Sequence, residues 1–319
     1  MTGVSKDILK KLAEDWWMFL IVLIGFWLHL KVLHLLAIVL KFTVGKYCFS
    51  KRKHLKRAGE WAIVTGATSG IGKAYADELA KDGLNIMLIG RNDQKLSSVA
   101  SELFNRYKTE TRVVVADFTI DNVYDTIENE IEKLPSVACL VNNVGMTHET
   151  DSFISSSWSN NKDFIKDIIH CNTLSTATMT RIVMPKMLSQ KQPNPAIINV
   201  TSYAGLKVFP YISIYSATKA FDIQFSRSIA EEVYNKKILI QTVCPLIVAT
   251  PMAKIDKPTF FIPTAETYVK SAVDILGVES FTYGYIRHDL KAFLYDLLPQ
   301  PIWIALIHIR VKLMKRKRE

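Results

Sequence analysis

A regular alternation of short apolar runs with longer amphipathic runs, from Glu60 to about Arg287, most constrains the fold of this chain. The longest amphipathic runs extend from about residue 161 to 190 and from about 214 to 234. The apolar runs, rich in β-branched residues, read WAIVTG, NIMLIG, RVVVAD, ACLVNN, AIINVTS and ILIQTVC. Buried strands that alternate with helices are typical of βαβ units. We therefore predict an α/β fold, a doubly wound parallel sheet with helices on both faces.

A glycine-rich turn, TGATSGIG, occupies residues 65–72 between the first predicted strand and the first predicted helix. Its glycines, Gly66, Gly70 and Gly72, allow the backbone to turn tightly and approach a pyrophosphate, and the helix N-terminus adds free N–H donors. Thr68 and Ser69 add hydroxyl donors. Because ligands of such sheets bind beyond the carboxyl ends of the strands, the turn predicts the phosphate site of a dinucleotide.

The end of the second predicted strand, LIGRN, distinguishes between two nicotinamide cofactors. An acidic residue at this position holds free ribose hydroxyls, whereas a cation beside a small neutral residue suits a 2′-phosphate. Gly90 followed by Arg91 matches the second pattern and predicts NADP(H); the alternative is that Arg91 is only a solvated surface charge. Asp117, at the end of the third strand, is placed to accept a hydrogen bond from the adenine amino group or to cap the next turn.

Ser202, Tyr215 and Lys219 form a candidate catalytic set. Tyr215 and Lys219 are four residues apart, so they share one face of the predicted helix. A free tyrosine, with a pKa of about 10, is a poor acid–base group at neutral pH, and a nearby ammonium stabilises the phenolate. Ser202 can hydrogen-bond a carbonyl or alkoxide oxygen while Tyr215 transfers the proton. The set predicts an oxidoreductase acting on a ketone or an alcohol, although each residue alone also fits a structural role.

In their order and spacing these motifs resemble the short-chain dehydrogenase/reductase family, over Glu60 to about Arg287. The resemblance rests on TGxxxGIG at 65–72, which includes Ile71, on NNxG at 142–145, on the Asn at 172, on the Ser at 202 and on YxxxK at 215–219. It implies a Rossmann-like fold, with the glycine motif, Ile71 included, binding the cofactor.

The resemblance also implies roles for individual residues. Asn143 would line the adenine-ribose side of the cofactor, and Asn172 would hold a water that links Lys219 to solvent as a proton relay. Tyr215 and Lys219 would contact the cofactor as well, Lys219 at the nicotinamide ribose, and Thr250 would contact the carboxamide. No metal is implied, and the four cysteines have no metal-ligand spacing.

Two residues depart from the family pattern, Val144 in place of an alanine and Leu246 in place of a glycine. These departures and the segment 245–290 are similar to the microsomal very-long-chain 3-oxoacyl-CoA reductases and 17β-hydroxysteroid dehydrogenases. This similarity implies NADPH-driven reduction of a lipid ketone, either a 3-oxoacyl-CoA or a ketosteroid, and the family resemblance implies a homodimer. Because Tyr215 is retained, we expect activity; the alternatives are a catalytically silent NADPH- or lipid-binding scaffold and a soluble reductase with a hydrophobic leader.

An apolar stretch from Trp16 to Leu40 is long enough to cross a hydrocarbon layer of about 30 Å. It is interrupted only by His29, Lys31 and His34, which either snorkel or mark a break between two half-spanning helices. The alternative, a cleaved signal peptide, fits poorly because the stretch is too long and has no small-residue cleavage site. We predict that residues 1–57 form an N-terminal membrane-anchor helix with a basic flank.

The net charge of +10 is concentrated in two segments. Six Lys or Arg lie between Gly45 and Arg57 and six more between Arg310 and Glu319, so the rest of the chain is close to neutral. Because these segments adjoin the apolar stretches, they suit anionic headgroups, and we predict a membrane partner and no nucleic acid. The basic flank stays cytosolic by the positive-inside rule, which places the dehydrogenase domain, residues 58–290, in the cytosol.

The remaining residues, 291–319, are predicted to form an apolar and basic extension. Its run PQPIWIALIHIRVKL suits a second membrane contact that lies in the interface. The tail has lysines at 317 and 315, third and fifth from the end, and resembles a dilysine endoplasmic-reticulum retrieval signal. Together these features predict a protein of the endoplasmic reticulum membrane.

Overall fold

The computed structural model describes residues 3–154, 162–236 and 238–316 of the 319-residue chain. Its centre is a seven-stranded parallel sheet with the strand order β3-β2-β1-β4-β5-β6-β7. The strands are β1 (Trp61–Thr65), β2 (Asn85–Gly90), β3 (Thr111–Val115), β4 (Val137–Asn142), β5 (Ala196–Val200), β6 (Leu239–Val243) and β7 (Phe281–Thr282). The doubly wound parallel sheet is confirmed, and all the predicted strands are present. The sequence does not predict β7, which is only two residues long.

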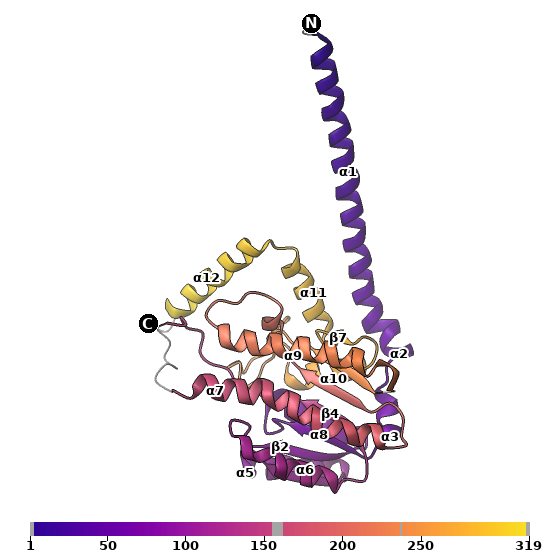
Figure 1. Ribbon diagram of the computed structural model, residues 1–319, viewed down its shortest axis with the longest axis vertical. Helices are drawn as coiled ribbons and strands as arrows, with labels where there is room; N and C mark the ends of the chain where they lie inside the picture. The colour runs from indigo at the N-terminus through magenta and orange to yellow at the C-terminus, as the bar shows by residue number, and fades with distance from the viewer. Residues whose placement is uncertain (1–2, 155–161, 237, 317–319) are drawn as a thin grey trace.

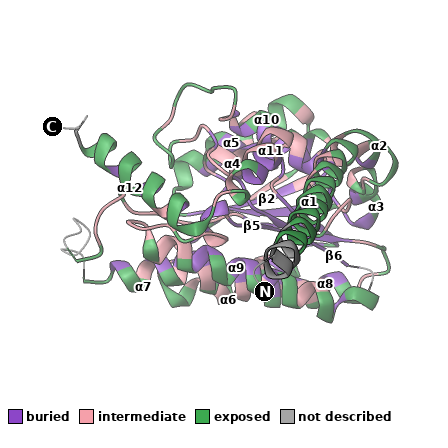
Figure 2. Cartoon of the chain, turned by 90° about the horizontal axis from the view of Figure 1, so that it is seen from above, coloured by how far each residue is buried: buried purple, intermediate pink, exposed green. Residues whose placement is uncertain are grey.

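Helices cover both faces of the sheet, as the view from above shows (Figure 2). One face carries α4 (Gly70–Lys81), α5 (Asp93–Tyr107) and α10 (Ala265–Asp274), and the other carries α6 (Tyr124–Glu132), α8 (Ser175–Ser189) and α9 (Ser213–Glu232). The helical run predicted from about residue 161 to 190 is divided into α7 (Phe164–Ile169), a π-helical turn (His170–Leu174) and α8.

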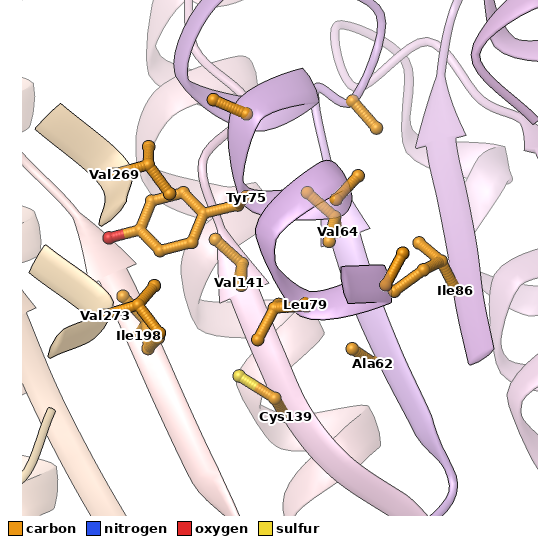
Figure 3. Packing of buried hydrophobic residues seen from close by; sticks show 14 of the residues in the cluster. Ala62, Val64, Tyr75, Leu79, Ile86, Cys139, Val141, Ile198, Val269 and Val273 are labelled. Atoms are coloured by element: carbon orange, nitrogen blue, oxygen red, sulfur yellow. The ribbon is translucent and has the colours of Figure 1, made fainter. Parts of the chain in front are cut away.

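The core beneath α4 shows why the first helix docks on the sheet (Figure 3). Tyr75 and Leu79 are one turn apart on α4 and are fully buried. The Tyr75 ring lies between Val269 of α10 and Val141 of β4, and Leu79 points toward Cys139 of β4, so that the glycine-rich turn just before α4 is held against the sheet. Burial of such side chains contributes about 1.5–3 kcal/mol each.

The N-terminal helix α1 (Gly3–Leu40) leaves the domain as a single long rod (Figure 1). With 38 residues it is about 57 Å long, which exceeds the hydrocarbon thickness of a membrane. Its apolar window has a mean hydropathy of 2.1 and is not buried against the domain. Because the helix is continuous, the break that the sequence left open at residues 29–34 does not occur.

Ion pairs fix the base of α1 to the α/β domain. After α1 the chain continues through a π-helical turn (Lys41–Gly45), α2 (Lys46–Cys48) and α3 (Leu55–Ala58). Three cations of this segment pair with acids of the domain: Lys41 with Glu279 and Asp289, Lys46 with Asp274, and Arg52 with Glu78, Asp82 and Asp274. Part of the basic flank therefore serves to hold the anchor on the domain.

The C-terminal helices also pack on the domain. The helix α11 (Ile286–Asp296) runs through residue 290, and α12 (Gln300–Arg316) follows after a bend of 115°. In α12 the side chains of Trp303, Ile307 and Val311 are buried in a third apolar cluster with Tyr203. The C-terminal extension is thus built into the wall of the fold.

Candidate active site

The predicted site residues lie at the carboxyl edge of the sheet. The glycine turn follows β1, Arg91 follows β2, Asp117 follows β3, Asn143 follows β4 and Ser202 follows β5. The strand order reverses between β1 and β4, and this topological switch point is where doubly wound sheets bind their ligands. The topology therefore brings together residues that are more than 100 positions apart in the sequence.

The glycine turn is a cradle that side chains would fill. Gly66 and Gly70 have positive φ angles, +66° and +55°, which favour glycine. A Cβ at Gly72 would lie 2.2 Å from the carbonyl oxygen of Gly66, so the two backbone segments are too close together for any side chain at residue 72. Ser69 is the N-cap residue of α4 and its side chain makes no capping hydrogen bond, while Ile71 packs on the core. The turn thus leaves the N-terminus of α4 open to an anion, and it fits the pyrophosphate of NADP(H).

Asn143 and Thr250 hold this cradle from two sides. The Asn143 Nδ2 donates to the carbonyl oxygens of Thr65 (3.0 Å) and Gly66 (3.3 Å). A Cβ at Gly70 would lie 3.2 Å from Cγ2 of Thr250, so Thr250 touches the phosphate turn although it follows β6. Asn143 therefore shapes the turn itself, and Thr250 is placed between the turn and the mouth of the sheet.

The predicted 2′-phosphate and adenine residues lie at the ends of β2 and β3. Gly90 faces Thr68, since a Cβ at Gly90 would lie 3.3 Å from Thr68 Cγ2. Arg91 is exposed, and its guanidinium forms no ion pair within the described ranges of the chain. Asp117 Oδ1 accepts hydrogen bonds from the backbone N–H (3.0 Å) and hydroxyl (2.9 Å) of Thr119. Asp117 therefore caps the turn after β3 with one oxygen, and the adenine contact stays a prediction.

Ser202 and Tyr215 flank a loop that is pressed onto α9. Ser202 accepts a hydrogen bond from the Ala204 N–H (3.2 Å) and so caps a short 3-10 turn (Tyr203–Gly205). A Cβ at Gly205 would lie 2.6 Å from the backbone of Lys219, which means that the turn directly contacts α9. Ser202 and Tyr215 are both half-buried, so a substrate can reach them.

Lys219 is buried among polar partners at the end of β5. Its Nζ donates to the carbonyl oxygen of Val200 (3.3 Å) and to Asp222 Oδ2 (3.0 Å). Burial acts against the ammonium, but the Asp222 carboxylate and the Tyr215 oxygen outweigh it and raise the pKa of Lys219. Burial also raises the pKa of the Asp222 carboxyl, yet the 3.0 Å contact makes the charged pair the state that this geometry favours. Sequence reasoning missed Asp222, although the i, i+3 spacing on a helix was a readable signal.

Asn172 lies in the π-helical turn between α7 and α8, the kind of irregularity that is frequent at functional sites. It is fully buried; its Oδ1 accepts from the Met146 N–H (2.7 Å), and its Nδ2 donates to the Met146 carbonyl (3.0 Å) and to Thr218 Oγ1 (2.9 Å). A Cβ at Gly145 would lie 3.4 Å from Asn172 Oδ1 and 3.7 Å from Lys219 Nζ. Asn172 therefore fixes the NNxG turn beside the ammonium.

The C-terminal helix completes the site in a way that the sequence did not indicate. The Trp303 Nε1 donates to the Val208 carbonyl (2.9 Å), and Tyr211 OH bonds to His308 Nδ1 (2.7 Å). Both contacts hold the loop between Ser202 and Tyr215. The two departures from the family pattern have a packing role nearby: Leu246 packs on the third apolar cluster, and Val144 packs on the second.

Lys254, in the segment after β6, forms an ion pair with Glu149 (2.7 Å), in the loop after β4. Both side chains are exposed, so this contact is worth little on its own. It shows that the segment after β6 reaches the loop after β4.

Comparison with known proteins agrees with this geometry. The sequence profile of the family described as short chain dehydrogenase matches residues 60–259. The very-long-chain 3-oxoacyl-CoA reductase of Mus musculus is 40% identical over 269 residues, which cover 82% of this chain and 85% of that protein. The protein of the same name from Macaca fascicularis is 43% identical over 248 residues, 78% of each chain.

Two solved structures share the fold. A structure from work on 7β-hydroxysteroid dehydrogenase stereoselectivity has a TM-score of 0.70 at 24% identity and covers 80% of this chain and 99% of its own. A short-chain dehydrogenase from Sphingobium yanoikuyae in complex with NADPH has a TM-score of 0.59 at 27% identity, covering 67% of this chain and 82% of its own.

Proposed function

Because this chain belongs to the short-chain dehydrogenase family, we propose that it reduces the keto group of a long-chain 3-oxoacyl-CoA with NADPH at a membrane surface. It is an NADP-dependent oxidoreductase acting on C=O and CH–OH groups. One observation carries the proposal. A glycine-lined phosphate cradle and a buried Lys219, next to Tyr215, lie together at one end of the sheet. The choice of a 3-oxoacyl-CoA over a ketosteroid is supported by the names of the relatives.

The chain's own groups account for the proton chemistry of this reaction. Bound NADPH supplies a hydride to the carbonyl carbon. Ser202 is proposed to hydrogen-bond the carbonyl oxygen, and Tyr215 to donate the proton that converts this oxygen to a hydroxyl. Lys219 then stabilises the phenolate left on Tyr215 until the proton is replaced from solvent. Asn172 keeps the turn beside Lys219 in place through its bonds to Met146.

Membrane attachment is proposed to involve two helices. α1 carries exposed apolar side chains along most of its length, and its ribbon is coloured as exposed over most of that length in Figure 2. α12 has a second apolar face besides its buried one, and this exposed row consists of Ile302, Leu306, Ile309 and Leu313. Both helices lie on the same side of the domain (Figure 1). A bilayer crossed by α1 would therefore meet the exposed row of α12 at its surface.

We further propose that the bilayer is that of the endoplasmic reticulum, with the catalytic domain in the cytosol. The support is the basic flank of α1 and the dilysine-like tail. Lys315 lies at the end of α12 and pairs with Asp151 (2.7 Å), and Lys317 lies outside the described residues. A homodimer is proposed through α9, where the rings of Phe221 and Phe225 stack at 6.0 Å and Phe221 is 45% exposed.

The test is NADPH oxidation by membranes that contain the full-length protein, with a long-chain 3-oxoacyl-CoA and a 17-ketosteroid offered in parallel. Tyr215→Phe should abolish turnover and leave NADPH binding intact. Tyr234→Phe is the matched control, because Tyr234 is 80% exposed and should leave the rate unchanged.

Three outcomes separate the possibilities. Turnover of the acyl-CoA alone supports the proposal, and turnover of the steroid alone overturns its substrate class. NADPH binding without turnover of either ketone would favour the silent scaffold.

A further inference from the structure

A buried carboxylate stands directly behind the proposed catalytic lysine. Asp222 is 1% exposed and Lys219 is 4% exposed, and both lie on the inner face of α9. Placing a carboxylate in such a site costs several kcal/mol unless it is paired, and an apolar side chain would fill the same space without this cost. An acid at this position therefore needs a reason other than packing.

The contacts of Lys219 show what the carboxylate does there. The Lys219 Nζ has one ion partner, Asp222 Oδ2 at 3.0 Å, within the part of the chain that the structure describes. Its other bond, to the Val200 carbonyl, is longer, at 3.3 Å. The carboxylate thus fixes the ammonium at the carboxyl end of β5. The ammonium also interacts electrostatically with the Tyr215 oxygen.

The pair changes the charge that faces the phenol. An isolated ammonium would present a full positive charge to Tyr215, whereas Lys219 and Asp222 together carry a net charge of zero. The other titratable groups around the pair do not replace this charge. The Cys171 and Cys244 thiols are neutral at pH 7, because burial raises their pKa values to about 11 and about 12. The remaining charges that act on these thiols are Arg91, Asp117, Asp167 and Arg227.

We propose that Asp222 is a positioning residue that acts through Lys219 and keeps the Tyr215 phenol protonated at neutral pH, the state in which it donates the proton for ketone reduction. This inference rests on the proposed function, because it assigns Asp222 a role in that reaction. Asp222 touches neither substrate nor cofactor; it limits how strongly the ammonium stabilises the phenolate. Removing its charge makes the site one unit more positive, so the first proton leaves the Tyr215–Lys219 pair at a lower pH, whichever group loses it.

The experiment is the pH profile of kcat for 3-oxoacyl-CoA reduction by the full-length protein, from about pH 6 to about pH 10. In Asp222→Asn, which keeps the shape of the side chain, the limb on which the rate is lost with rising pH should move down by about 1–3 units. Asp222→Glu retains the charge and should restore the wild-type limb. Asp289→Asn is the matched control, since Asp289 is also buried and paired with a lysine but lies on α11, away from Tyr215.

The outcomes separate the inference from the proposed function. Wild-type turnover with superimposable pH profiles for wild type and Asp222→Asn overturns the inference and leaves the function standing. No wild-type turnover of any ketone overturns both. If Asp222→Asn does not fold, as judged by its melting temperature and NADPH binding, Asp222→Ser removes the same charge and must show the same shift. A lower kcat at every pH with an unmoved limb marks a merely structural role and also overturns the inference.

Discussion

The tightest contact of the cofactor cradle gives a quantitative prediction. Replacing Gly72 by alanine would place a Cβ 2.2 Å from the Gly66 carbonyl oxygen and 2.5 Å from Asn143 Nδ2. Real Cβ atoms essentially never approach a heavy atom closer than 3.0 Å, so the turn must open by at least about 0.8 Å. Backbone on both sides of the contact must move, because Gly66 also receives the Asn143 bond.

The size of the effect follows from this displacement. Overpacking of this kind costs about 1–3 kcal/mol, and about 1.4 kcal/mol corresponds to a tenfold change in affinity. If the cost falls on the open, phosphate-binding form of the turn, the Kd for NADPH in Gly72→Ala should rise about 5- to 150-fold. Alanine is a better helix former than glycine by about 1 kcal/mol, so α4 itself should not be weakened.

The assay is NADPH titration by protein fluorescence with the full-length protein in detergent, together with its melting temperature. Gly25→Ala is the control, because Gly25 lies on α1, outside the cofactor site, and a Cβ there would meet nothing within 4 Å, so the Kd should change by less than about threefold. If Gly72→Ala binds NADPH as tightly as Gly25→Ala does, the assignment of the turn as the phosphate site is refuted.

Three further predictions concern the C-terminal helices. Trp303→Ala removes a buried ring and its hydrogen bond to Val208, so it should destabilise the fold by about 3–5 kcal/mol in thermal unfolding, and an unchanged melting temperature would contradict this packing. The double variant Leu306→Ser, Ile309→Ser alters exposed side chains, so it should leave the melting temperature unchanged but raise the KM of a long-chain acyl-CoA more than that of a short-chain one in membranes; equal effects would argue against a lipid contact. Burial raises the pKa of Asp289 to about 7, so the folded protein holds a proton that the unfolded chain releases near pH 4. This contribution to stability is complete below about pH 4 and is lost as the pH rises to about 7, and Asp289→Asn should flatten the fall of the melting temperature over that window.

Local sequence patterns were sufficient for the sheet because each long strand is a continuous apolar run. The apolar run AIINVTS, for example, lies between two predicted helices, and this arrangement is typical of a buried parallel strand. The sequence did not predict β7 because this strand is too short to show a hydrophobic periodicity. Its two residues, Phe281 and Thr282, pair only with the end of β6. Its existence depends on a tertiary contact, which a local pattern does not contain.

The site divides in the same way. The order of the motifs placed Gly66, Ser202 and Lys219 at one edge, because the carboxyl ends of parallel strands share that edge. What the sequence did not supply is the support behind them. The bond from Trp303 to Val208 joins residues 95 positions apart, and only the packing of α12 against the domain brings them together.

The two faces of α12 would connect the proposed membrane contact to the candidate active site. Its buried face, with Trp303 and His308, holds the loop between Ser202 and Tyr215. Its other face carries the exposed apolar row, and the helix lies on the side of the domain from which α1 departs (Figure 1). If the exposed face of α12 rests on the bilayer as proposed, the loop on its buried face lies about 10 Å from the lipid, since a helix is about 10 Å across. A lipid ketone dissolved in the bilayer would then reach Tyr215 without crossing bulk water, which is the step that an apolar acyl chain pays for most heavily.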